Sequence, residues 1–275
     1  YNAAIPVVRT VYLGPLIVDI PGWGQETDTA ISASPLITDS NVVFSVHLYP
    51  DAYNKVAGRA LIPEDMKNLF LHSDRPCIVG EFGDIQPDPV DQCDVKATVE
   101  AAKGVGFQAV YGWAWNGDGD TLNMVSPAWS SNPVAVEYTV TNYFWPILDL
   151  LRPPEVVPSV VPSLQPTDLV AMGGVNIQPS YYNNGNVTVG WETMNNFSAI
   201  KAVRIKITPD KVEQGGEWIR QACEQGYHTM LTFQNDTGKG SDDASVLIAA
   251  AKWWQTNYYN LSLFGSFDVN LMNEW

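Results

Sequence analysis

Residues 77–83 have the sequence CIVGEFG, a short apolar run that ends in Glu81 followed by Phe and Gly. Short runs rich in Ile and Val are typical of a buried β-strand. A single carboxylate at the end of such a strand can cap a helix, lie in solvent or belong to a functional site. The segments around it decide between these interpretations.

Seven other segments share this character. The eight predicted strands are residues 16–20, 42–48, 77–81, 109–115, 175–177, 203–207, 229–233 and 267–272. Apolar residues recur every three to four positions over residues 213–225 and 243–258, which predicts helices there. Because strands that alternate with helices form a parallel sheet, the pattern predicts an α/β fold, a closed (β/α)8 barrel that spans residues 1–275 as one domain.

The proline-rich segment 153–167, PPEVVPSVVPSLQPT, interrupts this pattern with five prolines and one charged residue. Proline removes a backbone donor and fixes φ, so the segment suits neither a helix interior nor a central strand. We expect a stiff linker. It either joins two halves of one barrel or separates two half-sized α/β domains.

The composition limits the class of partner. The chain has 30 acidic and 15 basic residues, a net charge of −15. Nucleic-acid binding relies on Lys and Arg, so no nucleic-acid partner is expected. No stretch approaches the about 20 apolar residues of a membrane helix. Most of the ten Trp and twelve Tyr are expected in the core, but rings at strand ends can hold the apolar faces of sugar rings.

The three cysteines, Cys77, Cys93 and Cys223, include no C-x-x-C pair and have no His at metal-ligand spacing. A zinc site is therefore not predicted. Cys77 and Cys93 flank one predicted loop, and they either form a disulfide or remain free thiols.

A second strand also ends in a carboxylate. Residues 267–275, FDVNLMNEW, place Asn273 and Glu274 after an apolar run. Residues this close to the end of the sequence are ordinarily frayed and solvated. The pairing with Glu81 favours another interpretation, because glycoside hydrolysis needs two carboxyl groups that face the scissile bond.

Aromatic and imidazole side chains mark other strand ends. His47 and Tyr49 alternate so that both point to the same side. The same argument places Trp113 and Trp115 on one face, and Trp115 is the candidate platform for a sugar ring. Trp23, in the turn GWGQ at residues 22–25, is a further indole near a strand end.

Arg204 lies inside the apolar run 203–207. Arginine is almost never buried without a partner. A carboxylate inside the barrel is expected beside it, and Glu81 is the natural one.

Taken together, these segments resemble family 5 of the glycoside hydrolases, the cellulase and mannanase family, over almost the whole chain. That family carries Arg, His or a similar group, Asn-Glu, His-x-Tyr, Glu and Trp at the ends of strands 2, 3, 4, 6, 7 and 8. Here the matching residues are Arg204, Asn273 with Glu274, His47 with Tyr49, Glu81 and Trp115. Gln234 stands where the family often has His, which leaves the role of that position in doubt.

The order of these motifs departs from the family. Counted by them, the chain runs through strands 5, 6, 7 and 8, then the linker 153–167, then strands 1, 2, 3 and 4. The resemblance therefore implies a circular permutant in which the linker joins the family's usual C- and N-termini, which lie close together in most domains. Residues 1–12 would be a remnant of helix 4.

The resemblance implies a secreted, monomeric retaining enzyme that acts on a polysaccharide and needs no metal or cofactor. Glu81 would be the nucleophile, kept ionised by Arg204 and Tyr49. Glu274 would be the acid/base, in surroundings that lack a close cation. Asn273, His47, Trp115, Trp23 and Gln234 would contact the sugar.

Four short stretches bear on the substrate that the resemblance implies. The stretches GVNIQPSYY and GWAWNGDGD are similar to the branch that cuts β-1,4-glucan and mixed-linkage β-glucan. The turn GWGQ and the ending NEW are similar to bacterial β-mannanases. A glucanase (endoglucanase or lichenase) is preferred, an endo-β-1,4-mannanase is the alternative, and a non-catalytic carbohydrate-binding barrel ranks lower because both carboxylates are present.

Overall fold

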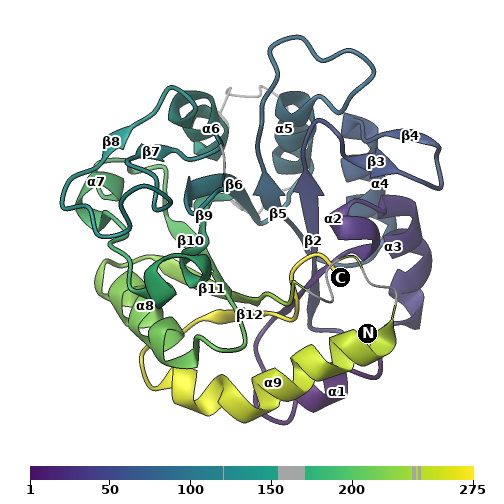
Figure 1. Cartoon of the computed structure of the whole chain (residues 1–275). Helices are drawn as coiled ribbons and strands as arrows, with labels where there is room; N and C mark the ends of the chain where they lie inside the picture. Colours follow the sequence, from purple (N-terminus) through teal and green to yellow (C-terminus); the bar gives the residue numbers. More distant parts are fainter. Residues whose placement is uncertain (120, 154–170, 237–239, 241–242) are drawn as a thin grey trace, which may run out of the picture.

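The computed structural model describes residues 1–119, 121–153, 171–236, 240 and 243–275. Eight parallel strands close into a barrel in the order β1-β12-β11-β10-β9-β6-β5-β2 (Figure 1). They are β1 (Leu16–Asp19), β2 (Val42–Leu48), β5 (Cys77–Phe82), β6 (Ala109–Asn116), β9 (Met172–Ile177), β10 (Ala202–Ile207), β11 (His228–Phe233) and β12 (Asp268–Asn270). The predicted (β/α)8 barrel is confirmed.

Both halves of the chain build this one sheet. β6 pairs with β9 across the proline-rich segment, and β1 pairs with β12, so the ring has no edge. The alternative of two half-sized domains is therefore wrong. Apart from Pro153, the linker predicted at 153–167 lies outside the described residues.

Helices surround the barrel (Figure 1). They are α1 (Ile5–Val8), α2 (Pro21–Gly24), α3 (Thr27–Ala33), α4 (Pro63–His72), α5 (Val95–Val105), α6 (Phe144–Leu151), α7 (Trp191–Met194), α8 (Val212–Glu224) and α9 (Ala244–Ser262). Short hairpins β3 (Tyr53–Asn54) with β4 (Arg59–Ala60) and β7 (Val125–Ser126) with β8 (Thr139–Val140) decorate the loops. No helix in the described part of the chain combines the length and apolar character of a membrane span.

Local sequence explains where the helices start and stop. α5 begins after Asp94, whose Oδ1 accepts a hydrogen bond from the Ala97 N–H at 2.9 Å, as an N-cap should. It ends at Gly106, which has φ of 106°, a left-handed conformation that glycine adopts without steric cost. α4 starts with Pro63, where the missing N–H of proline removes no helical hydrogen bond.

Two apolar layers hold the barrel together. A large core lies between strands and helices, and a smaller cluster fills the lower interior of the barrel. The interior cluster consists of Ile17, Val43, Ile78, Ala109, Tyr111, Ala202 and Met230. Cys77, Cys93 and Cys223 are free thiols, so of the two states considered for Cys77 and Cys93 the structure has the unbridged one.

Candidate active site

Polar side chains replace apolar ones toward the carboxyl ends of the strands. Side chains two positions apart share a face of a strand, so Ile17 is followed by Asp19 and Ala202 by Arg204. This layer is buried yet polar, and its members are Asp19, Ser45, His47, Glu81, Asn176, Arg204, Lys206, Thr232 and Asn270. Buried polar groups cost free energy unless they are paired, so their contacts define the site.

Glu81 lies at the centre of the layer. Its Oε1 is 2.7 Å from Arg204 Nη1 and 2.9 Å from Lys206 Nζ, while its Oε2 accepts a hydrogen bond from the Tyr49 hydroxyl at 2.9 Å. The expected Arg204–Glu81 ion pair is thus present. Burial and the charge of Glu81 raise the pKa of Tyr49 well above its ordinary value, so the hydroxyl remains a donor.

Arg204 is fixed by several acceptors at once. Its Nη1 also donates to Asn176 Oδ1 at 2.9 Å, and its Nη2 donates to Asn273 Oδ1 at 2.7 Å. Asp19 Oδ2 lies 3.4 Å from Nη2. A guanidinium shared among these oxygens holds Glu81 and Asn273 in a defined relative position.

His47 stands between three carboxylates. Its Nε2 is 3.3 Å from Asp19 Oδ2, and its Nδ1 is 3.6 Å from Glu274 Oε1 and 3.9 Å from Glu81 Oε1. Burial alone would lower the pKa of His47, but the charges of Glu81 and Asp19 outweigh it and raise the pKa to about 9. The ring is therefore a cation at neutral pH.

Glu274 lies beyond β12, which is shorter than the predicted strand 267–272. Its φ of 51° is unusual for a residue with a side chain. The Glu274 N–H donates to Asp19 Oδ2 at 2.9 Å, and its carbonyl accepts the Gly240 N–H at 2.7 Å. These bonds hold both peptide groups of Glu274, and its side chain is 10% exposed.

The two glutamates face each other. One carboxylate oxygen of Glu81, one of Glu274 and a ring nitrogen of His47 all lie within 4.8 Å of one another. This trio is the cluster of metal-type ligands found among the described residues. It fits a divalent cation poorly, because a protonated His47, Arg204 and Lys206 already supply positive charge at the same carboxylates.

The charges act on the two carboxyls to different degrees. Burial would raise the pKa of Glu81, but Lys206, His47 and Arg204 hold it well below its usual range. Burial and the charge of Glu81 would raise the pKa of Glu274, but the approach of His47 to 3.6 Å contributes to a net lowering. The expectation that Glu274 lacks a close cation is therefore wrong, because His47 gains a proton from the field of the surrounding carboxylates.

The sugar platform expected at Trp115 is also wrong. Trp115 is fully buried outside the barrel against Phe144, and its Nε1–H donates to the Val189 carbonyl at 2.8 Å. The register of β6 against β9 shifts between Gly112 and Asn116, so the two-residue alternation fails there. Trp113 points into the site instead, with Lys206 Nζ 4.0 Å from its ring centroid.

Trp23 and Gln234 both lie at the rim of the site. Trp23 is 46% exposed and lies within α2, which contacts the site because Gly24 packs closely against the His47 ring. Gln234 is buried, and its Nε2 donates to Asp236 Oδ1 at 2.9 Å. The hydroxyl of Tyr181, which was not among the predicted site residues, donates to the same oxygen of Asp236 at 2.5 Å.

Six buried residues of this layer were not identified from the sequence: Asp19, Ser45, Asn176, Lys206, Thr232 and Asn270. Each is a polar residue inside a predicted or observed apolar strand, the same signal that drew attention to Arg204. Asp19 is the most connected of them, since it contacts His47, Arg204, the Glu274 N–H and Asn270 Nδ2.

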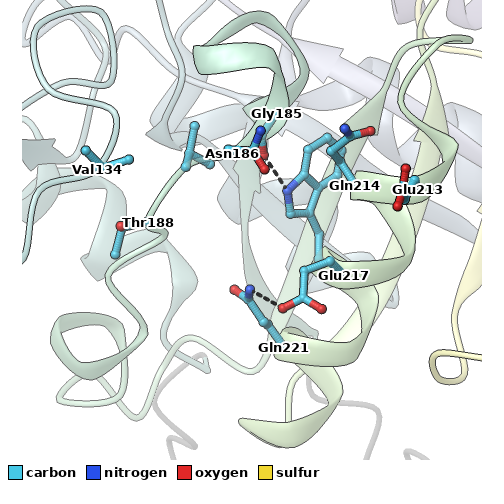
Figure 2. Close-up of a pocket in the computed structure, with 10 residues that line it drawn as sticks. Val134, Gly185, Asn186, Thr188, Glu213, Gln214, Glu217 and Gln221 are labelled. Atoms are coloured by element: carbon cyan, nitrogen blue, oxygen red, sulfur yellow. Dashed lines mark hydrogen bonds between the residues drawn. The ribbon is translucent and has the colours of Figure 1, made fainter.

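The structure also contains pockets away from these glutamates. One of about 490 Å³ lies between α8 and residues 185–188 (Figure 2). Its polar groups bond to each other: Gln221 Nε2 donates to Glu217 at 2.7 Å, and Trp218 Nε1–H donates to the Gly185 carbonyl at 3.1 Å. It contains none of the buried charges described above, so the barrel mouth is the better candidate site.

Comparison with known proteins agrees with this geometry. Residues 1–119 match the family model of cellulase (glycosyl hydrolase family 5). A mannan endo-1,4-beta-mannosidase of Streptomyces lividans is 35% identical over 134 residues, which are 46% of this chain and 33% of the relative, so the match spans about a third of that protein. No solved structure matches the chain. The family match and this relative make the chain similar to glycosyl hydrolase family 5, and the closed parallel barrel is consistent with that similarity.

Proposed function

We propose that this protein is a retaining endo-β-glycanase that hydrolyses β-1,4-glucan or mixed-linkage β-glucan. The observation that carries the proposal is the approach of Glu81 and Glu274 oxygens within 4.8 Å. Retaining enzymes place their two carboxyl groups about 5 Å apart, whereas inverting enzymes leave room for a water between them.

In the first step, Glu81 attacks the anomeric carbon. Its Oε1 is occupied by Arg204 and Lys206, so Oε2, which accepts the Tyr49 hydroxyl, is the oxygen that attacks. The low pKa of Glu81 keeps it ionised for this step. Glu274 must take up a proton before this step, because its pKa is lowered in the free protein. It then protonates the leaving oxygen, and a covalent glycosyl-enzyme results.

In the second step, Glu274 accepts a proton from the attacking water. Formation of the ester removes the negative charge of Glu81, one of the factors that raise the pKa of Glu274. The pKa of Glu274 therefore falls in the intermediate, and the carboxyl ionises more readily. This change suits its switch from acid to base.

Asn273 has the geometry to hold the sugar. Arg204 occupies its Oδ1, which leaves Nδ2, without a hydrogen-bond partner among the described residues, as a donor for a sugar hydroxyl. Gln234 Oε1 is a buried acceptor that likewise has no hydrogen-bond partner among the described residues. We assign the exposed Trp23 ring, at the edge of the site, to a more distant sugar unit.

A second candidate is endo-β-1,4-mannanase activity, favoured by the similarity to the Streptomyces mannosidase. Release of reducing sugar from lichenan, carboxymethylcellulose and galactomannan compares the two directly. Following the anomer formed first by NMR tests retention. Activity on none of the polymers, or initial release of the α-anomer, would contradict the proposal.

We further propose that the strand order is a circular permutation. The family match ends at residue 119, just after β6, as expected if residues 1–119 hold the last four strands of the family's order. Because polymeric glycans do not cross membranes, we also propose that the protein acts outside the cell. We propose that it acts as a monomer.

A further inference from the structure

Lys206 is a buried cation to which the proposed mechanism gives no step of its own. It is 3% exposed, and its Nζ is 2.9 Å from Glu81 Oε1 and 4.0 Å from the Trp113 ring centroid. Trp113 is itself fixed, since its Nε1–H donates to Asp118 Oδ1 at 2.9 Å. A desolvated ammonium next to a carboxylate interacts more strongly than a surface pair does.

The contacts of Lys206 differ from those of Arg204. Arg204 joins Glu81, Asn176, Asn273 and Asp19 and so organises the whole layer. Within the described part of the chain, Glu81 is the sole ion-pair partner of Lys206 Nζ. The arrangement therefore directs one additional charge at a single atom, Oε1 of Glu81.

Oε1 is the oxygen that does not bond to the sugar. In the glycosyl-enzyme it is the ester carbonyl oxygen, while Oε2 is bonded to the anomeric carbon. When water attacks that carbon, the carbon–Oε2 bond breaks, its electron pair returns to the Glu81 carboxylate, and the proton of the water goes to Glu274. Negative charge thus develops on Glu81 beside Lys206 in this step.

We infer that Lys206 is a positioning residue that speeds the departure of Glu81 from the glycosyl-enzyme. The inference rests on the proposed retaining mechanism. A cation at Oε1 makes Glu81 a better leaving group and, for the same reason, a weaker nucleophile. Removing the charge should therefore slow the second step while the first step is retained.

The test uses a 2,4-dinitrophenyl β-glycoside of the active sugar series, whose leaving group needs no proton. We expect Lys206→Met to lower steady-state turnover about 10- to 100-fold, the worth of one charge-assisted hydrogen bond. A burst of dinitrophenolate equal to the enzyme concentration should precede that slow phase. Added azide, which attacks the intermediate without needing a base, should raise the turnover of the variant.

Lys206→Arg, which keeps the charge, should recover most of the turnover and abolish the burst. Lys201→Met, the same change at an exposed position just before β10, is the matched control. Lys206→Gln keeps the ring contact without the charge and replaces Lys206→Met if that variant is not folded by circular dichroism.

The outcomes separate the two claims. If the wild type turns over neither the gluco nor the manno substrate, the proposed function fails. If the wild type is active and the folded neutral variant has no burst and no response to azide, whether its rate falls or not, the inference about Lys206 is wrong.

Discussion

At the scale of single residues, Glu81 and Glu274 differ in how much charge surrounds them, and their amide variants should differ accordingly. Glu274→Gln should lower kcat on polymer about 100- to 10,000-fold, the usual contribution of an acid/base. The loss should be much smaller for the first turnover of a dinitrophenyl glycoside. Glu81→Gln should abolish turnover on both, because the nucleophile is lost. Polymer assays and dinitrophenolate release measure this.

The same two variants should differ in their free energy of unfolding. Glu81→Gln leaves Arg204 and Lys206 buried without their shared counter-ion, a change that costs about 3–5 kcal/mol. Glu274→Gln should cost less, because His47 keeps Asp19 and Glu81 as neighbouring carboxylates. Glu217→Gln on α8, remote from the site, is the control for both. Near-normal turnover in either site variant would remove that residue from the mechanism.

His47 makes a prediction about pH. Its pKa of about 9 in the fold exceeds the ordinary value of 6.5, so the protonated ring stabilises the native state. The contribution is complete below about pH 6.5 and is lost as pH rises through about 9, and it is on the order of 3 kcal/mol. Asp19, Glu81 and Glu274 are the groups that face the ring.

Denaturant unfolding of wild type and His47→Asn between pH 6 and pH 10 measures this contribution. The difference in unfolding free energy between them should shrink as pH rises. A difference that stays constant across the range would mean that the ring is neutral in the fold.

At the scale of the elements, β6 shows that strand alternation can fail within a single strand. Trp115→Ala should destabilise the protein by about 3–5 kcal/mol, because it empties a site in the outer core. The activity per folded molecule should remain. Trp113→Ala should have the opposite profile, with a small change in melting temperature and a large loss of kcat/KM. Equal effects of the two changes on kcat/KM would contradict the placement of these rings.

The elements also show what the sequence could predict. The strands at 42–48, 203–207 and 229–233 were found within one residue at each end, because buried parallel strands are continuous apolar runs. Arg204 and its partner Glu81 followed from the cost of a lone buried charge. Trp115 was misplaced because a local shift in register leaves no mark in composition.

Glu274 shows a second limit to what the sequence can predict. Its surroundings were expected to lack a cation, yet His47 is charged through the combined field of Asp19, Glu81 and Glu274. Asp19 comes from a strand more than 250 positions away from Glu274 in the sequence, and the two meet because β1 pairs with β12. Contacts of this kind depend on closure of the barrel, which no local pattern contains.

At the scale of the whole molecule, any of the eight strands of the closed barrel could come first in the chain. Every neighbouring pair, including β6 with β9 and β12 with β1, is hydrogen-bonded, so a chain cut elsewhere can keep all eight pairings. The rings of Tyr1 and Trp275 lie 5.5 Å apart. The cost of closing a short loop between them rises only slowly with its length. These facts make the permutation directly testable.

A rearranged chain would begin at Ala171, pass from Trp275 to Tyr1 through a short Gly-Ser link, and end at Arg152. We expect the rearranged chain to fold and to give the same circular dichroism spectrum. Its kcat/KM on the preferred polymer should stay within about tenfold of the original, which corresponds to a change of about 1.4 kcal/mol. The unrearranged chain with the same Gly-Ser extension after Trp275 is the control. A rearranged protein that folds but is inactive, beside an active control, would mean that Glu274 needs the break after Trp275 to reach its position. A rearranged protein that does not fold would mean that the present strand order is required by the barrel, against the permutation.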